Sequence, residues 1–168
     1  MSSRYYSVSE VNELLPRVRE AFTLVMQLRS QLKPVYRRLE QADAAPDRSD
    51  FEIQLPGATP EVIRDRAAFK GMIEMLNEEL ATISELGGNV KDLDTGLVDW
   101  RALRHGEDIL LCWRFGETEI GFWHDMETGF AGRRPVAELL GTEAAPTVAT
   151  TPPPLPTTML PPEQAPRK

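Results

Sequence analysis

Residues 7–40 read SVSEVNELLPRVREAFTLVMQLRSQLKPVYRRLE, and this stretch decides the fold. Ser7 and Glu10 have the spacing of a capping box, which predicts a helix beginning near residue 8. Apolar side chains then recur at steps of three and four and form one helix face over about eight turns. Pro16 and Pro34 cannot donate a backbone hydrogen bond, so we expect a kink at the first and a weak or broken end after the second. The apolar face consists of Val11, Leu14, Val18, Phe22, Val25, Leu28, Leu32, Val35 and Leu39.

A second helix is predicted after a loop over residues 42–58. Thr59-Pro60 is typical of a helix start, and Gly87-Gly88 is typical of a helix end. Arg66 falls on the apolar seam between these signals. We expect its stem to be buried and its guanidinium to reach water, and the alternative is a buried functional arginine. The seam consists of Val62, Phe69, Ile73, Leu76, Leu80 and Ile83.

The two helices, over about 8–39 and 60–86, should pack as an antiparallel, coiled-coil-like hairpin that buries both apolar faces. Residues 1–41 carry seven basic and four acidic side chains, whereas residues 59–88 carry three basic and six acidic ones. These opposite charges favour the pairing. A hairpin of two helices leaves apolar surface uncovered, so we also expect a homo-oligomer such as a four-helix bundle.

After Gly88 the apolar period falls to two, which predicts a small antiparallel sheet of three or four strands over about residues 89–136. Val90–Leu93 and Leu97–Trp100 flank a short turn and should form one hairpin. The fold class is therefore α+β.

A second β-hairpin is predicted over residues 109–124, around a two-residue turn at Gly116-Glu117. In this register Leu111 pairs with Phe122 and Ile109 pairs with His124, so that nearly all side chains on one face are apolar.

Composition limits the class of protein. The net charge of −7 argues against binding to nucleic acid or to an anionic membrane surface. Neither a signal peptide nor an apolar run of membrane-spanning length is visible, and Cys112 is the single cysteine, so a cytoplasmic protein is predicted. Residues 1–141 are interpreted as one domain. Residues 142–168 include eight prolines and are predicted to be a disordered tail, available to a protein partner.

Carboxylates gather around one imidazole in the β segment. No paired-histidine or Cys/His spacing typical of a metalloprotein is present, yet one imidazole with several carboxylates is a donor set for a divalent metal. Alternatively the aspartates cap turns and the histidine is structural. The candidate ligands are Asp92, Asp94, Glu119, His124 and Asp125, with Asp99 and Glu127 nearby.

Residues 129–135, GFAGRRP, are a second candidate site. Arg133 and Arg134, together with His124, could bind a phosphate or carboxylate, since arginine offers two parallel donors. The alternative is that both arginines pair with neighbouring acids. Cys112, between Leu111 and Trp113, is interpreted as packing without reactivity.

The segments YYSVSEVNELLPRVRE (5–20), GGNVKDLDTGLVDW (87–100), LCWRFGETEIGFWHD (111–125) and GFAGRRP together resemble a family of small bacterial proteins known as domain of unknown function 2203. The resemblance extends over about residues 4–140 and implies a helical region followed by this motif region. It implies no activity, ligand or cofactor.

Two classes of function follow. The first is a non-enzymatic interaction or scaffold protein that self-associates through its helices. The alternative is a protein, with or without enzymatic activity, that binds a small ligand or a divalent metal near His124.

Overall fold

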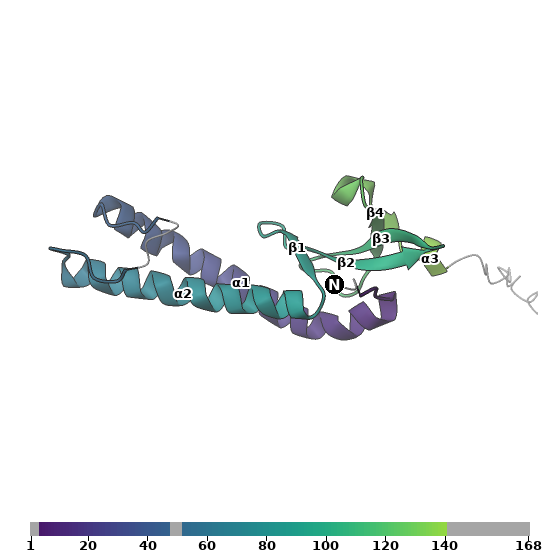
Figure 1. Cartoon of the computed structure of the whole chain (residues 1–168), viewed down its shortest axis with the longest axis horizontal. Helices are drawn as coiled ribbons and strands as arrows, with labels where there is room; N and C mark the ends of the chain where they lie inside the picture. The colour runs from purple at the N-terminus through teal and green to yellow at the C-terminus, as the bar shows by residue number, and fades with distance from the viewer. Residues whose placement is uncertain (1–3, 48–51, 141–168) are drawn as a thin grey trace, which may run out of the picture.

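The computed structural model describes residues 4–47 and 52–140. Helices α1 (Val8–Gln41) and α2 (Pro60–Glu85) run side by side as a long hairpin, and a small sheet lies at one end of it (Figure 1). Arg38 contacts Asp65 near the loop, and Arg17 contacts Glu79 near the sheet, so the helices are antiparallel. The α+β prediction is confirmed, and the tail predicted over residues 142–168 lies outside the described residues.

Helix α1 begins as its sequence predicts. Ser7 accepts a hydrogen bond from the Glu10 amide, and the Glu10 carboxylate accepts one from the Ser7 amide. The helix then continues through both internal prolines to Gln41, so the predicted break after Pro34 is wrong. Val35 and Leu39 are buried beyond this proline, and their packing offsets the hydrogen bond that proline cannot make. None of the helices in the described ranges is long and apolar enough to cross a membrane.

The described residues form five strands, which are antiparallel and pair in chain order, and this is more than the three or four predicted. They are β1 (Asn89–Asp92), β2 (Leu97–Arg104), β3 (Glu107–Arg114), β4 (Phe122–Asp125) and β5 (Arg134–Pro135), with a 3-10 turn η1 (Gly129–Gly132) before β5 and a short helix α3 (Ala137–Leu140) after it.

The predicted hairpin of β1 and β2 is confirmed. The longest hairpin joins β2 to β3, around a two-residue turn at His105-Gly106 that sequence reasoning missed. Both turn residues have positive φ, 52° and 87°, as a type I′ turn requires.

The predicted register of β3 and β4 is wrong by one residue. Leu110, not Ile109, lies opposite His124, and Leu111 lies opposite Trp123. A shift of one residue moves every β4 side chain to the other face of the sheet. The strands are joined by residues 115–121, because β4 begins only at Phe122 and not after a two-residue turn.

One side chain of the hairpin itself and one from α1 hold this longer connection. The Trp113 indole N–H donates to the Glu117 carbonyl over 2.9 Å. The Ile120 amide donates to the Asn12 side chain on α1 over 2.8 Å. The register is therefore set by tertiary contacts as well as by the turn.

The main core lies between one face of the sheet and the ends of both helices. Trp100, Trp113 and Phe22 are fully buried there. Gly88, which links α2 to β1, lets this core close, because a Cβ on it would lie 2.9 Å from Ile83 and from Val98. Two smaller clusters continue along the hairpin.

Arg66 differs from its predicted position. Its side chain is 3% exposed and does not reach water. The guanidinium donates to the carbonyls of Ala44 and Glu52 in the loop between the helices. Arg66 therefore ties the loop to α2, because buried carbonyls require donors.

Candidate metal centre

The second face of the sheet, opposite the tryptophans of the core, carries three buried side chains capable of binding a metal. Asp99 on β2 lies opposite Cys112 on β3, and His124 on β4 lies opposite Leu110, two residues before Cys112. Their ligand atoms all lie within 4.8 Å of one another. The exposed fractions are 4%, 1% and 4% for Asp99, Cys112 and His124. We call these three residues the Asp-Cys-His cluster.

The hydrogen bond at Nδ1 of His124 determines what the other ring nitrogen can do. Nδ1 lies 2.7 Å from the carbonyl oxygen of Asp125, and because a carbonyl only accepts, Nδ1 carries the hydrogen. In the neutral ring, Nε2 then presents a lone pair. A histidine held in this way through its other nitrogen is typical of metal ligands.

Nε2 of His124 lies 3.4 Å from Oδ2 of Asp99. This is longer than the roughly 2.7–2.9 Å of a hydrogen bond between a cationic N–H and a carboxylate. Two ligands bonded to a tetrahedral zinc ion at about 2.0–2.1 Å lie about 3.4 Å apart. The spacing thus matches two ligands of one ion better than a direct hydrogen bond.

Asp99 has a second oxygen that is not satisfied. Oδ1 is buried and accepts no hydrogen bond from the described residues. An unpartnered buried carboxylate oxygen costs free energy, and a bound cation would remove this cost.

The Cys112 thiol is unreactive as the chain stands. Burial, and then the neighbouring Asp99 carboxylate, raise the pKa of the thiol to about 12. A thiol in this state is neither a nucleophile nor a redox centre at neutral pH. A divalent cation would replace the thiol proton, since metal binding requires the thiolate.

A cavity of about 270 Å³ adjoins the cluster. Three protein ligands with space at a fourth position are typical of catalytic zinc sites, in which water or substrate completes the tetrahedron. Lys91 on β1 and Met126, Glu127 and Phe130, from the segment after β4, line the cavity with the cluster.

Two of the acids predicted as metal ligands instead cap turns. Asp92 accepts hydrogen bonds from the Asp94 amide and the Thr95 hydroxyl. Asp125 accepts from the amides of Glu127 and Thr128. These hydrogen bonds hold the pKa of each carboxyl below its ordinary value. The largest contribution comes from Thr95 for Asp92 and from Thr128 for Asp125.

The other two predicted acids are also outside the cluster. Asp94 forms an ion pair with Arg29 of α1 at 2.6 Å. Glu119 is exposed, in the connection before β4. The structure therefore brings His124 alone, of the five predicted metal ligands, into the cluster.

Arg133 and Arg134 have different environments. Among the described residues, neither makes a hydrogen bond or ion pair with the His124 ring. Arg133 lies 2.8 Å from Glu117, donates to the Cys112 carbonyl and stacks over Phe122. This side chain is neutralised by Glu117, as the alternative interpretation predicts for a loop arginine. Arg134 is exposed and lies over the Trp123 ring.

Sequence reasoning placed Asp99 near the candidate ligands without choosing it as one, and it interpreted Cys112 as packing. The usable signal was the position of Asp99, a charged residue between the apolar Val98 and Trp100 in a predicted strand. Cys112 gave no signal by itself, because only the registers of three strands bring it to the other two.

The family model described as "Uncharacterized conserved protein (DUF2203)" matches residues 4–136. The chain belongs to this family. The resemblance seen in the sequence is thereby confirmed, and the DUF2203 match contains all three residues of the Asp-Cys-His cluster. No curated protein and no solved structure matches the chain.

Proposed function

We propose that this DUF2203 protein binds a divalent transition metal of the zinc type through Asp99 Oδ, Cys112 Sγ and His124 Nε2. The observation that carries the proposal is the 3.4 Å separation of His124 Nε2 and Asp99 Oδ2, combined with the fixed Nδ1 hydrogen bond. Thiolate, imidazole and carboxylate together suit zinc better than magnesium or calcium, which prefer oxygen ligands.

The bound metal would have one coordination position facing the cavity. A metal in such a position can polarise a carbonyl or phosphoryl oxygen, or lower the pKa of a bound water. Any chemistry at the site would occur at this position.

Metal binding is tested by calorimetry and by thermal unfolding of chelator-treated protein with added Zn²⁺. We expect one ion per chain and stabilisation of about 2.7 kcal/mol at a free-metal concentration one hundred times Kd. Co²⁺ should give the intense charge-transfer absorption of a thiolate ligand. Cys112→Ser should remove that band, and Asp99→Asn and His124→Ala should abolish stoichiometric binding.

Two matched variants serve as controls. Asp92→Asn removes a carboxylate that caps a turn, and His105→Ala removes the exposed second histidine. Both should bind Zn²⁺ as the wild type does. If His124→Ala lowers stability equally with and without metal, and wild-type protein takes up no stoichiometric ion, then His124 and Asp99 form only a structural pair and the proposal is wrong.

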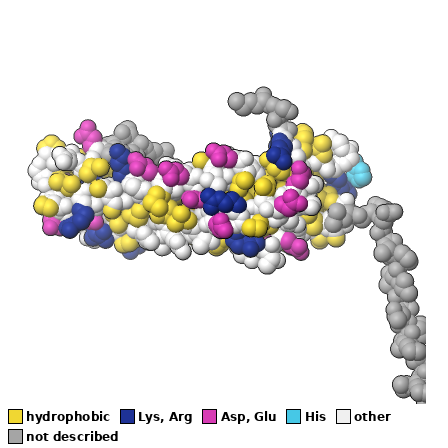
Figure 2. Space-filling view, turned by 90° about the horizontal axis from the view of Figure 1, so that it is seen from below, with side chains coloured by type: hydrophobic (Ala, Val, Ile, Leu, Met, Phe, Trp, Pro, Cys, Tyr) yellow, Lys and Arg dark blue, Asp and Glu magenta, His cyan; other side chains and the backbone are white. Residues whose placement is uncertain are grey.

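Self-association through the hairpin is a second candidate function, favoured by the burial of α2. Along 26 residues, this helix buries only Arg66, Leu76 and Ile83. Met75 is 46% exposed, and hydrophobic side chains are visible along the helical end of the molecule, on the left of Figure 2. The half-buried apolar residues of α2 are Val62, Ile63, Phe69, Met72, Ile73 and Leu80.

A second copy of the chain is the occupant that the charges favour. Helix α1 has six basic and four acidic residues, whereas α2 has three basic and six acidic ones. A two-fold pairing that places α1 of each copy against α2 of the other therefore joins opposite charges.

The mass in solution tests this second candidate. Wild-type protein should sediment at twice the monomer mass, and Met75→Glu should shift it to the monomer. Leu103→Glu, at an exposed position on β2, should leave the dimer intact. A wild-type chain that remains monomeric at high micromolar concentration would exclude self-association.

A further inference from the structure

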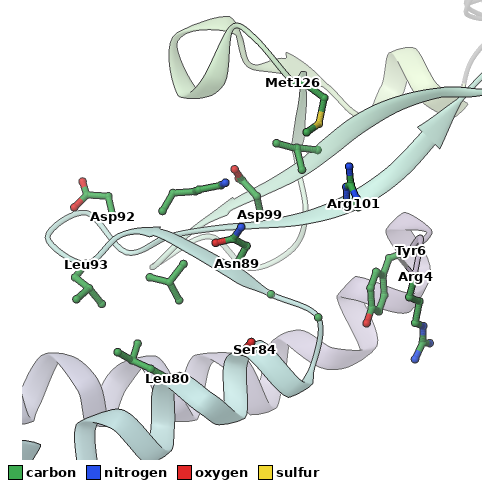
Figure 3. Close-up of a pocket in the computed structure, with 15 residues that line it drawn as sticks. Arg4, Tyr6, Leu80, Ser84, Asn89, Asp92, Leu93, Asp99, Arg101 and Met126 are labelled. Carbon is green, nitrogen blue, oxygen red and sulfur yellow. The ribbon is translucent and has the colours of Figure 1, made fainter. Parts of the chain in front are cut away.

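A groove of about 1030 Å³ runs along the edge strand β1, from the end of α2 to the sheet face that carries the proposed metal centre. Leu80 and Ser84 of α2 line one side of it, whereas Asp99 and Asn89 point away from α2, toward Met126 (Figure 3). A groove of this size is at the upper end of the range for small-molecule sites.

The groove and the smaller cavity meet beside the metal ligands. Both are lined by Lys91, Asp99, Leu110 and Met126. A molecule in the groove could therefore extend to the open coordination position without crossing the core.

The charges in the groove have the opposite sign to those of the whole chain. The chain has a net charge of −7, yet the groove is lined by Arg4, Lys91 and Arg101, with Asp92 as the one acid other than Asp99. A divalent metal would balance Asp99 and the Cys112 thiolate, and Arg4 and Arg101 are paired with Glu10 and Asp108. Lys91 is therefore the cation beside the filled site, with Asp92 and Glu127 as the further acids that line the two cavities. An ammonium group beside a metal with an open position attracts an anion.

Lys91 is the cation most available to a ligand. Arg4 contacts Glu10 at 3.5 Å, and Arg101 contacts Asp108 at 3.1 Å. Lys91 is exposed and has no ion pair with any residue of the described ranges. Its position on β1 places it beside both cavities, whereas the two arginines line only the groove.

Resting on the proposed metal function, we infer that the groove binds a small molecule bearing an oxyanion, held between the open position of the metal and the Lys91 ammonium. One oxygen of a phosphate or carboxylate completes the metal tetrahedron, and another accepts from Lys91. This arrangement joins a Lewis acid to a charge-assisted hydrogen bond.

The test uses the full chain loaded with Co²⁺, so that one absorption spectrum reports both the metal and its fourth ligand. The thiolate charge-transfer band shows that the metal is bound. Inorganic phosphate is then titrated in, with acetate as a separate arm that distinguishes a phosphate site from a carboxylate site. We expect a saturable change in the ligand-field bands with at least one of these anions, but not with matched sodium chloride.

Lys91→Met tests the second contact without touching a metal ligand. We expect its charge-transfer band to be unchanged and its anion affinity to fall by about tenfold or more, since it loses one charge-assisted hydrogen bond. Lys33→Met, which removes an exposed lysine on α1, should bind the anion as the wild type does.

The outcomes separate the two proposals. A normal charge-transfer band with no response to either anion overturns the oxyanion inference and leaves metal binding intact. Equal affinity of Lys91→Met and wild type also overturns it, because the metal would then hold the anion alone. If no charge-transfer band forms, the metal proposal fails and the inference fails with it.

Discussion

The two ends of the molecule are stabilised in different ways. At the sheet end, two layers enclose a core with fully buried Trp100, Trp113 and Phe22. Toward the loop between the helices, α1 and α2 share only a seam, around Leu28 and Leu76, and no third layer is present in the described ranges. A two-layer core excludes water from both sides, whereas a seam between two helices leaves one side of each helix in solvent.

Along the hairpin, polar contacts compensate for the smaller hydrophobic burial. Arg66 binds two loop carbonyls, and Arg38 forms two hydrogen bonds of 2.7 Å with Asp65. Hydrophobic burial therefore decides stability at the sheet end, while directional contacts secure the distal end.

The largest expected effect is on the free energy of unfolding, and it tests the difference in burial between the sheet core and the helix seam. Trp113→Ala removes a fully buried side chain and should lower the free energy of unfolding by about 3–5 kcal/mol. Leu76→Ala, at a position 8% exposed on the seam, should cost less, about 2–3 kcal/mol, because solvent and neighbouring side chains can fill the space. Chemical denaturation measures both. Equal losses would contradict the claim that the two ends differ.

Arg66→Met tests the hydrogen bonds that hold the loop to α2 at the distal end. The loop carbonyls of Ala44 and Glu52 would lose a charged donor, so we expect a loss of about 1–3 kcal/mol and faster amide exchange near the loop. Arg64→Met is the matched control, because Arg64 is on the same helix and its ion pair with Glu61, at 3.8 Å, is exposed. A comparable loss in Arg64→Met would show that the loop contacts are unimportant.

The smallest expected effect concerns pH. Hydrogen bonds from Arg38 hold the pKa of Asp65 below its ordinary value. Stabilisation from this pair is therefore present above the ordinary pKa of about 3.9 and is lost as the pH falls through the lower folded-state pKa. Because the pair is exposed and screened by solvent, its contribution should be the smallest of the effects considered.

Arg38→Gln should lower the denaturation midpoint near neutral pH and make less difference at acidic pH, where the Asp65 carboxylate becomes protonated. Arg37→Gln, at an exposed neighbouring position, should leave the midpoint unchanged at both pH values. A constant difference between Arg38→Gln and wild type across this range would exclude the Asp65 carboxylate as the cause.

The helical part of the fold could be predicted because its signals are local. Ser7 and Thr59 mark the helix starts, and apolar residues every three or four positions mark the faces. The β3–β4 register could not be predicted in the same way. Residues 120–124 read IGFWH, in which Phe122 and Trp123 are both large and aromatic, so the pattern allows either face to be buried.

Contacts distant in sequence resolve that ambiguity. Asn12 on α1 accepts from Ile120, and Arg133 binds Glu117. Neither contact follows from the spacing of nearby residues. The cluster was missed for the same reason, since Asp99, Cys112 and His124 come together only after both strand registers are known.

The positions of the tryptophans have a practical consequence. All three are on the sheet, at Trp100, Trp113 and Trp123, whereas the distal hairpin has Tyr36 against Phe69. Indole emission is therefore a local probe, insensitive to fraying of the helices near the loop. Far-ultraviolet circular dichroism, by contrast, is dominated by those helices. Recording both signals in a single heating experiment would reveal the order in which the two ends melt, without any added label.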